Sequence, residues 1–583
     1  METLRLVPYP RKIRINEGFC SASVQAVQTL IEPMGEEYSI KIRPDGIEIK
    51  GGSAGLRYAG LTLRLLREQF GDKLPCLSIE DGPVMRSRGF MLDVCRHFMP
   101  TEQIKRLLDA AALLKLNRFH WHLTDDQGWR LEIKSWPELT RTGAVRGRSA
   151  FGICDPEQSN DGYYTQEEVR DIVRYAQERD IETIPEIEIP GHASAMLAAY
   201  PWLGCELPDR DSAEIGRSAG IFDRLLCAGK DESIAFIKDV LREVTALFPS
   251  KYVHIGGDEA LKLRWRRCPC CKRRMKALGI TSEDALQRWL VLEIGAYLSQ
   301  LGKETIVWND ALEGGELPPY FIVQFWRGNP EAAKRHAAAG GRMIDSDTAY
   351  AYLDYPFHRI DAWKILSAPQ ADYAVLPGFL GAEFPLWTEY VADFKTAGRQ
   401  LFPRLAAGAE RAWRGDGNMK DSFGDRWEAY IPKIEALGIR PAPPETWHMD
   451  ADSARRDRER FEQQRQCPEY LRAMAVKTHL HDQDRMERLM QRIGLREDTL
   501  RMLSDYCYGG LDGSRKKALE LAFPGIGELA EKLDRAAAAW EAGKWDDDEE
   551  QVLMDALKPY CPTGEALFTA VGRQENEENR TAG

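Results

Sequence analysis

The chain has 583 residues, of which 43% are hydrophobic and 29% are charged, and its formal net charge is −12. This length and composition are typical of an ordinary globular protein with two to four domains. The negative charge argues against nucleic acid or an anionic membrane surface as a partner.

The N-terminal sequence predicts no secretory signal, because no apolar run of about seven residues follows its basic residues. No stretch reaches the length of a membrane span, which is about 18 uncharged apolar residues, so membrane insertion is not expected. The twelve cysteines are scattered along the chain. This scatter fits reduced thiols and predicts a cytoplasmic location.

Residues 1–83 are expected to form a small α+β domain. Two short strands are predicted at Ile40–Ile42 and Gly46–Lys50. The apolar spacing of Ala54–Phe70 predicts an amphipathic helix.

In residues 84–440, short β-rich runs alternate with helical stretches, as a (β/α)8 barrel requires. The predicted strands are Gly89–Val94, Arg118–Leu123, Glu182–Ile189, Tyr252–Ile255, Glu304–Trp308, Tyr320–Phe325, Arg342–Ser346 and Phe379–Phe384. Predicted helices between them include Thr101–Leu116, Glu232–Phe248 and Thr165–Asp180, the last with Thr165 and Glu168 as a capping box. The predicted fold class is α/β, a (β/α)8 TIM barrel with a small N-terminal α+β domain and a C-terminal helical region.

Residues 445–583 follow the proline-rich linker Pro441–Pro444 and are predicted to be a helical region. Met474–Gln491 and Lys517–Ala542 carry apolar residues at helical spacing, and the tail Arg573–Gly583 is expected to be disordered. The sequence of this region contains no catalytic constellation. Packing or oligomerisation is therefore the simplest role for it, and the oligomeric state stays unknown.

Three cysteines, Cys268, Cys270 and Cys271, lie close together among basic residues. A zinc site would need a fourth ligand and usually a C-x₂-C spacing. No metal is therefore expected here, and the sequence predicts no cofactor elsewhere.

The most informative stretch is Lys251–Ala260, in which an apolar strand leads into Gly256 and Gly257 and then into two adjacent acids, Asp258 and Glu259. The glycines would let another molecule approach the backbone closely. Acids at the C-terminal ends of barrel strands are typical of glycosidases. For this decapeptide alone a solvated turn is the simpler interpretation, and the other strand ends are what overturn it.

Several of those strand ends carry polar groups that suit a sugar. Arg88, at the first strand, would grip two vicinal hydroxyls with its planar fork, unless it forms a salt bridge at the bottom of the barrel. His120 and His122 share one face of the second strand. His192 follows a Pro-Gly corner after the third strand, where a histidine is equally well explained as a satisfied core group.

Aromatic residues end three of the last four strands, at Trp308, Trp326 and Trp387. Tryptophan faces stack on the C–H faces of sugars and line apolar sites. A barrel core prefers branched aliphatic residues, so packing alone explains these tryptophans poorly. Tyr352 and Asp354 follow the seventh strand.

With these motifs in this order, residues 1–440 resemble family 20 of the glycoside hydrolases, the β-N-acetylhexosaminidases. The matching motifs are R-G-x-x-x-D-x-x-R-H, H-W-H-L-x-D-D, P-E-I-x-x-P-G-H, H-I-G-G-D-E, Y-L-D and L-W-x-E. The resemblance implies a retaining, exo-acting hydrolase that removes terminal β-linked N-acetylglucosamine or N-acetylgalactosamine from a glycan or glycoconjugate. It also implies substrate-assisted catalysis, in which the acetamido oxygen of the sugar attacks C1 and gives an oxazolinium intermediate.

The resemblance implies catalytic roles for individual residues. Glu259 would be the general acid and then the base that activates water. Asp258 would accept the acetamido N–H and stabilise the developing positive charge, and Tyr352 would donate to the acetamido oxygen. His192 and Asp125 would form a network behind the catalytic acid, with Asp126 as an alternative to Asp125.

The implied substrate-binding residues are Trp308, Trp326, Trp387, Arg88, Asp354 and Glu389. The tryptophans would enclose the acetamido methyl group and stack against one face of the sugar ring. Arg88 would bind the 3- and 4-hydroxyls, and the two acids would take the outer hydroxyls. Glu188 stands where many family members carry aspartate, so it is left out of the catalytic set.

Two other functions remain open at this point. His120-x-His122 on a barrel strand is a reasonable metal pair for a metal-dependent amidohydrolase or deacetylase, although tryptophans stand where that enzyme would need further histidines. The second alternative is a non-catalytic sugar-binding protein on the same fold. Such a protein would have no need for a proton donor at Glu259.

Overall fold

The computed structural model describes residues 4–147, 160–207, 214–217, 220–369, 371–415 and 417–465. The predictions for Met474–Gln491, Lys517–Ala542 and Arg573–Gly583 lie outside these residues. Residues 1–146, 160–215 and 223–458 form one compact unit, and the second unit, residues 147–159, 216–222 and 459–583, lies largely outside the described part. Among the described helices, none is long and apolar enough to cross a membrane.

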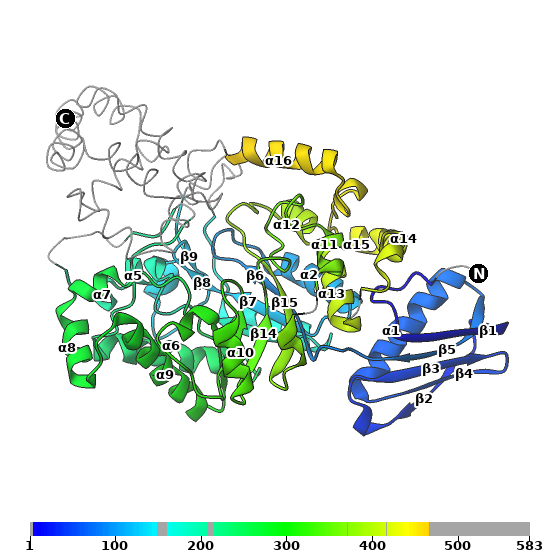
Figure 1. Cartoon of the computed structure of the whole chain (residues 1–583), viewed down its shortest axis with the longest axis horizontal. Helices are drawn as coiled ribbons and strands as arrows, with labels where there is room; N and C mark the ends of the chain where they lie inside the picture. The colour runs from blue at the N-terminus through cyan, green and yellow to red at the C-terminus, as the bar shows by residue number, and fades with distance from the viewer. Residues whose placement is uncertain are drawn as a thin grey trace. The chain divides into compact units, whose positions relative to one another are not determined.

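The N-terminal part forms a five-stranded sheet with one long helix (Figure 1). Its strands are β1 (Lys12–Ser21), β2 (Ala26–Leu30), β3 (Tyr38–Arg43), β4 (Gly46–Gly51) and β5 (Lys73–Asp81), in the order β1-β5-β3-β4-β2. Side chains alternate between buried and more exposed along β3, so that Ile40 and Ile42 face the core. Helix α1 (Ser53–Phe70) buries Leu63 and Leu66. Both strands and the helix predicted here are confirmed.

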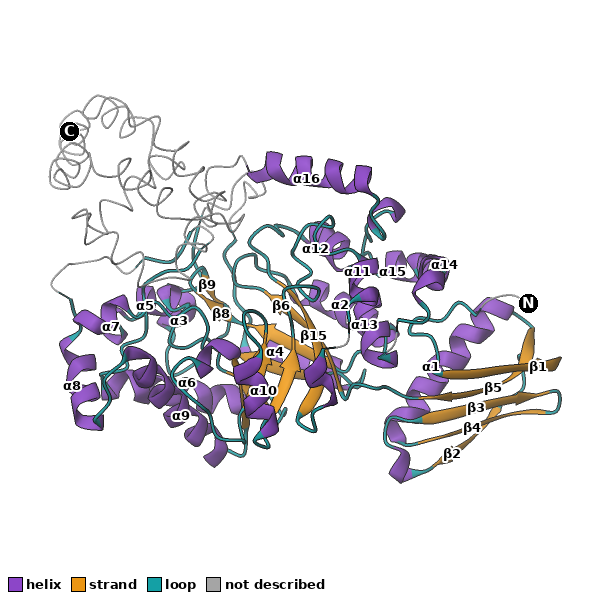
Figure 2. Cartoon of the chain, viewed as in Figure 1, coloured by secondary structure: helices purple, strands orange, loops and turns teal. Residues whose placement is uncertain are grey.

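Eight parallel strands close into a barrel (Figure 2). In barrel order they are β6 (Ser87–Asp93), β7 (Arg118–His122), β10 (Glu182–Glu186), β11 (Tyr252–His254), β12 (Glu304–Trp308), β13 (Ile322–Phe325), β14 (Arg342–Asp345) and β15 (Phe379–Leu386). Ile184, Tyr252, Ile306, Ile322 and Ile344, one from each of five consecutive strands, form a separate buried cluster. A layer of mainly branched side chains is how such a barrel fills its interior. All eight predicted strands are confirmed, and so is the predicted α/β class, a (β/α)8 barrel with a small N-terminal α+β domain.

Helices surround the barrel strands (Figure 2). The described helices that follow β6 in the chain are α2 (Thr101–Leu113), α3 (Glu138–Arg141), α4 (Gln166–Gln177), α5 (Ser194–Ala199), α6 (Asp231–Leu247), α7 (Leu263–Arg267), α8 (Pro269–Leu278), α9 (Glu283–Gln300), α10 (Glu331–Ala338), α11 (Ala362–Ser367), α12 (Phe394–Leu401), α13 (Arg404–Arg414), α14 (Phe423–Glu428), α15 (Ile431–Ala436) and α16 (Ala451–Arg465). The capping box of Thr165 and Glu168 is present. Helices α2 and α4 each end three residues before the predicted position, and Lys115 and Asp180, with φ of 57° and 59°, lie just beyond them.

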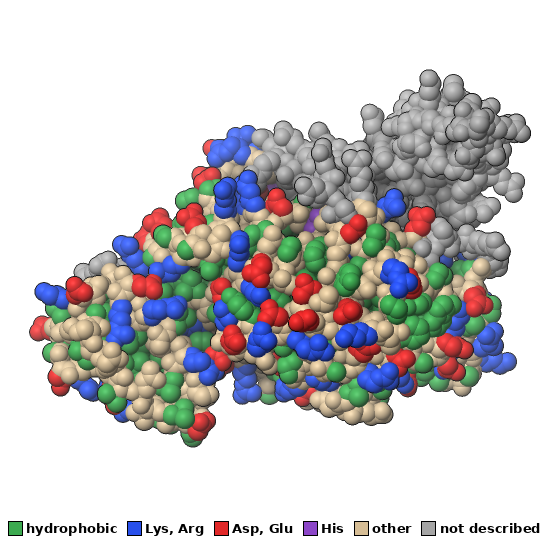
Figure 3. Space-filling view, turned by 180° about the vertical axis from the view of Figure 1, so that it is seen from behind, with side chains coloured by type: hydrophobic (Ala, Val, Ile, Leu, Met, Phe, Trp, Pro, Cys, Tyr) green, Lys and Arg blue, Asp and Glu red, His purple; other side chains and the backbone are tan. Residues whose placement is uncertain are grey.

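Basic and acidic side chains of the described residues are interspersed on the face drawn in Figure 3. Such mixing gives no extended field of one sign on that face of the described residues. The expectation that nucleic acid is not a partner stays a prediction.

Arg88 lies at the amino end of β6, the opposite end of the barrel from the predicted site. Its buried guanidinium donates hydrogen bonds to the Glu36 carboxylate at 2.7 Å, the Lys115 carbonyl at 3.0 Å and the Tyr58 hydroxyl at 2.9 Å. The prediction that Arg88 binds sugar hydroxyls is therefore wrong, and the alternative of a salt bridge at the barrel bottom is correct. The reason is strand direction, since barrel enzymes bind ligands at the carboxyl ends of their strands.

We expect Arg88→Gln to lower the free energy of unfolding by about 2–4 kcal/mol, because it leaves buried acceptors unpaired and breaks a charge pair with Glu36. Equilibrium urea denaturation measures this change. The control is Arg64→Gln, which removes an exposed ion pair of 3.8 Å with Glu68 and should cost less than about 1 kcal/mol. Equal losses in the two variants would show that Arg88 does not anchor the N-terminal sheet to the barrel.

Candidate active site

His192 connects an acid after the second barrel strand to the adjacent acids after the fourth. Its Nδ1 lies 3.1 Å from Asp125 Oδ1, and its Nε2 lies 3.8 Å from Asp258 and 3.9 Å from Glu259. Although burial opposes the shift, the Asp125 carboxylate raises the pKa of His192 well above its ordinary value. A positively charged imidazole therefore faces both acids.

Asp125, which ends β8 (Thr124–Asp125), is better placed than Asp126 for this network. Asp125 Oδ2 lies 2.9 Å from His122 Nε2 and 2.9 Å from Arg96 Nη2. Asp126 instead accepts hydrogen bonds from the backbone N–H and hydroxyl of Ser194 at 2.8 and 2.5 Å. The geometry therefore favours Asp125, and Asp126 fixes the first turn of α5.

Asp258 is a buried carboxyl whose main positive neighbour is His192. Burial raises its pKa to about 7, and the negative charges of Glu259, Asp310 and Glu186 add to the shift, while His192 opposes it. Near neutral pH Asp258 therefore exists in both its protonated and its ionised form.

Glu259 has a strained backbone and is held in place by two residues that the motifs did not predict. Its φ is 48°, in the left-handed region that non-glycine residues rarely adopt. Its backbone N–H donates to Asp310 Oδ2 at 3.2 Å, and its carboxylate lies 3.4 Å from Arg327 Nη1. Asp310 stands two residues after Trp308, and Arg327 directly follows Trp326. Their proximity in the sequence to two predicted tryptophans is the only signal that the sequence offers for them.

Gly256 makes room for Glu188, a buried acid of the protein itself. Gly256 has a φ of 66°, and a Cβ there would lie 1.6 Å from Glu188 Oε2. The expected close approach by another molecule at this glycine is therefore replaced by an internal contact. Burial raises the pKa of Glu188 well above its ordinary value, and the charge of Asp258 adds to this shift. These causes favour the protonated form of Glu188 beside the acid pair.

Four aromatic side chains form a closed circuit beside the acids, and we call it the aromatic box: Trp308, Trp326, Tyr352 and Trp387. Their ring centroids are separated by 6.5 Å (Trp308–Trp326), 5.9 Å (Trp326–Tyr352), 6.4 Å (Tyr352–Trp387) and 6.1 Å (Trp387–Trp308). Burial raises the pKa of Tyr352 well above its ordinary value, and the charges of Asp258 and Asp354 add to the shift. The Tyr352 hydroxyl therefore keeps its proton, and both acids lie close enough to act on it.

A second arginine of the first motif, Arg96, lies at the carboxyl end of the barrel. Its guanidinium is 2.9 Å from Asp125, 3.9 Å from Glu389 and 5.1 Å from the ring centroid of Trp387. Although burial opposes it, the Asp125 charge raises the pKa of Arg96 well above its ordinary value. Arg96, rather than Arg88, is the arginine that the structure brings to the predicted residues.

The two strand histidines, His120 and His122, have carboxylates at both ring nitrogens. His120 lies 2.8 Å from Glu383 and 3.0 Å from Glu186, and His122 lies 2.5 Å from Glu186 and 2.9 Å from Asp125. Burial opposes protonation, yet Glu383 and Glu186 raise the pKa of His120 to about 10, and Glu186 and Asp125 raise the pKa of His122 to about 9. A protonated imidazole has no lone pair for a metal. In this form the two histidines stabilise buried carboxylates rather than bind a metal.

Trp308 connects the aromatic box to this histidine network. Its indole N–H donates to Glu186 Oε1 at 2.8 Å. Its ring centroid lies 4.9 Å from that of His254 and 6.1 Å from that of His120. This hydrogen bond to Glu186 fixes the orientation of the Trp308 indole.

A closed (β/α)8 barrel with paired acids and an aromatic box at its carboxyl end has the arrangement of barrel glycoside hydrolases. Residues 86–416 match the sequence profile of "Glycosyl hydrolase family 20, catalytic domain". The chain belongs to glycoside hydrolase family 20, and the resemblance inferred from the motifs is confirmed.

Two relatives and one solved structure illustrate the similarity. The chain is 39% identical over 417 residues to a β-hexosaminidase of Porphyromonas gingivalis, an alignment that covers 66% of this chain and 52% of that protein. It is 32% identical over 431 residues to a β-hexosaminidase of Akkermansia muciniphila, covering 70% of this chain and 85% of the relative. The crystal structure of a Vibrio harveyi exo-β-N-acetylglucosaminidase in complex with N-acetylglucosamine gives a TM-score of 0.66 at 29% identity, covering 76% of this chain and 79% of that one. The chain therefore spans only about half the length of the first of these relatives.

Gly256→Ala should destabilise the protein more than alanine at an equally strained but open position. Gly279 has the same φ of 66°, and no atom lies within 4 Å of the place that an added Cβ would take, so Gly279→Ala tests backbone strain alone. We expect a loss of about 1–2 kcal/mol for Gly279→Ala and about 1–3 kcal/mol more for Gly256→Ala, which must also displace Glu188. Urea denaturation of both variants gives the difference. Equal losses would mean that Glu188 moves away freely.

Proposed function

We propose that this protein is a retaining exo-β-N-acetylhexosaminidase that removes terminal β-linked N-acetylglucosamine or N-acetylgalactosamine from glycans or glycoconjugates. The observation that carries the proposal is the aromatic box beside the Asp258 carboxyl. An apolar enclosure next to a hydrogen-bond acceptor and the Tyr352 donor suits an acetamido group, which has a methyl, an N–H and a carbonyl oxygen. The names of the relatives support the same sugar.

The adjacent acids favour a reaction in which the substrate supplies the nucleophile. An ordinary retaining glycosidase places two carboxyls about 5 Å apart across the scissile bond. Neighbouring side chains such as Asp258 and Glu259 leave the backbone from almost one point and cannot flank a bond in this way. In the proposed reaction the acetamido oxygen forms a bond to C1 while the glycosidic C–O bond breaks.

Proton transfer and charge stabilisation then divide between the two acids. Glu259 gives its proton to the leaving oxygen, and Asp258 accepts the acetamido N–H and stabilises the cationic oxazolinium ring. Tyr352 donates to the acetamido oxygen and directs it toward C1. Water next attacks C1, returns a proton to Glu259 and opens the ring, so the configuration at C1 is retained.

We assign the outer hydroxyls of the sugar to Arg96, Glu389 and Asp354. A guanidinium can donate two parallel hydrogen bonds to vicinal hydroxyls, and carboxylates accept from hydroxyls. Arg96 lies against Trp387 of the box and near Glu389, which supports this assignment. A guanidinium with neighbouring carboxylates can form hydrogen bonds with a 4-hydroxyl of either configuration, which allows both N-acetylglucosamine and N-acetylgalactosamine.

A cytoplasmic location stays a prediction. The cysteines of the described residues are free thiols, which is consistent with a reducing compartment. Fractionation of the source cells with an antibody against the chain would test it.

Glu259→Gln and Asp258→Asn should each lower kcat on 4-nitrophenyl N-acetyl-β-glucosaminide by about 100-fold or more, because they remove the proton donor and the charge that faces the oxazolinium. The wild type should release intact N-acetylhexosamine and leave 4-nitrophenyl β-glucoside uncleaved, since that sugar lacks the acetamido oxygen. Glu167→Gln, on the exposed face of α4, is the matched control and should retain full activity. Release of acetate instead of the sugar would favour the deacetylase, and sugar binding without any turnover by the wild type would favour a binding protein.

The acid limb of the kcat/KM profile should reflect the ionisation of Asp258. Activity requires its carboxylate, so the rate should be present above a pKa of about 7 and fall as the pH drops below it. Asp310→Asn removes a negative charge that raises this pKa, and the limb should therefore move to lower pH, whatever happens to the maximum rate. Asp452→Asn, at an exposed position of α16, is the charge control and should leave the limb unmoved. A limb that stays in place in Asp310→Asn would show that Asp258 does not control it.

A further inference from the structure

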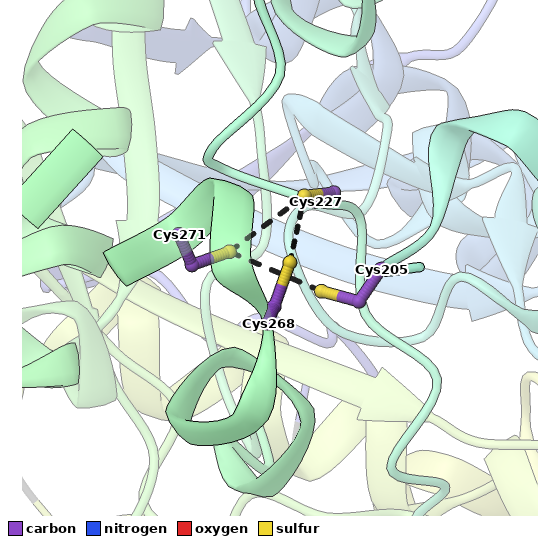
Figure 4. Close-up of side chains that lie close together, drawn as sticks. All are labelled: Cys205, Cys227, Cys268 and Cys271. Atoms are coloured by element: carbon purple, nitrogen blue, oxygen red, sulfur yellow. Dashed lines mark hydrogen bonds between the residues drawn. The ribbon is translucent and has the colours of Figure 1, made fainter. Parts of the chain in front are cut away.

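Four cysteine side chains converge on one point outside the candidate active site (Figure 4). Cys205 follows the 3₁₀ turn Pro201–Leu203, Cys227 lies shortly before α6, and Cys268 and Cys271 lie at the start of α8. Three of the four are buried and Cys205 is partly buried. Cys205 and Cys227 lie far from Cys268 and Cys271 in the sequence, so the fold brings these cysteines together.

The spacing of the sulfur atoms fits four ligands of one metal ion. The Sγ–Sγ distances are 3.7 Å for Cys227–Cys268, 3.6 Å for Cys227–Cys271 and 3.9 Å for Cys205–Cys271, and all four sulfurs lie within 4.8 Å of one another. Zinc–sulfur bonds of about 2.3 Å in a tetrahedron place the sulfurs about 3.8 Å apart. A disulfide would instead bring two sulfurs to about 2.05 Å.

We propose that Cys205, Cys227, Cys268 and Cys271 bind one structural zinc ion. Four cysteine thiolates around a closed tetrahedral position are typical of structural zinc, whereas catalytic zinc keeps one position open. The expectation of no metal considered Cys268, Cys270 and Cys271 together, and it overlooked that Cys268 and Cys271 already have the C-x₂-C spacing. The other two ligands come from a different loop.

Cys270 is the cysteine of this segment that does not join the cluster. It lies between two ligands in the sequence, yet its sulfur accepts a hydrogen bond from Arg273 at 3.0 Å. Residues three apart on a helix lie on the same face, whereas adjacent residues do not. Cys268 and Cys271 can therefore bind the same ion while Cys270 faces away. Cys270 therefore provides a matched control within the same turn.

The electrostatic surroundings favour thiolates, which are the form that binds zinc. The amino end of α8 carries the positive end of the helix dipole, and Cys268 is its N-cap residue. The helix dipole therefore partly compensates the negative charge of thiolates gathered at this end of α8.

The proposed ion would join the two loops that carry the catalytic residues. Cys205 and Cys227 belong to the segment after β10 that includes His192, and the other ligands follow Asp258 and Glu259 after β11. The two segments already touch, since a Cβ on Gly229 would lie 2.2 Å from the Cys270 carbonyl carbon. The Leu226 N–H donates to the Pro190 carbonyl at 3.0 Å, two residues before His192. The zinc would position these loops and take no part in the reaction itself.

Metal analysis of the purified full-length protein, prepared without chelator, tests the proposal. We expect one zinc per chain in the wild type and in Cys270→Ser, and loss of nearly all zinc in Cys227→Ser. The melting temperature should fall in Cys227→Ser and stay near the wild-type value in Cys270→Ser, because structural zinc binding contributes to folding free energy. These readouts do not depend on hydrolytic activity, so they are independent of the proposed function.

A second measurement keeps the proposal testable if Cys227→Ser does not fold. Titration of the wild type with a mercurial thiol reagent should release zinc to a colorimetric chelator in step with the modification of four thiols. Cobalt taken up in place of zinc should show the thiolate charge-transfer and tetrahedral ligand-field bands. Wild-type protein without zinc, with iron in its place, or with these four cysteines paired as disulfides would overturn the assignment.

Discussion

A buried carboxylate stays ionised only where enough donors or positive charges surround it, and this constraint divides the acids at the carboxyl end of the barrel. Glu186 accepts hydrogen bonds from Trp308 and His122, and its pKa lies well below the ordinary value although burial opposes this. Asp258, with His192 as its main positive neighbour, has its pKa raised to about 7. Such opposite shifts let acids in one site take different roles in one reaction.

The same end of the barrel contains backbone that the surrounding structure must hold in place. His192 and Glu259 have φ of 51° and 48°, conformations that cost free energy and persist only when neighbours enforce them. Both residues belong to the loops after β10 and β11, and the four cysteines join the same two loops. A metal clamp there would supply the rigidity that precise side-chain positions require.

The strands could be predicted because each is a short apolar run at the spacing a barrel requires, and the motif order predicted the acids, tryptophans and Tyr352. Arg88 and Arg96 belong to one motif, however, and only strand direction separates a barrel-bottom anchor from a residue of the site. Asp310 was missed because it carries no motif of its own. Cys205 and Cys227 gave no signal, since their pairing with Cys268 and Cys271 depends on long-range contacts that periodicity does not contain.

The proposed use of two adjacent acids depends on their facing different partners. Glu259 lies by Arg327, whereas the charge of Asp258 acts on Tyr352 of the aromatic box. Because the nucleophile belongs to the sugar, the protein needs only to enclose the acetamido group and to stabilise the charge that forms on it. A sugar without an acetamido group would leave the aromatic box unfilled. It would also form no oxazolinium cation for Asp258 to stabilise. The contacts that accelerate the reaction of one class of sugar are therefore the same contacts that exclude another.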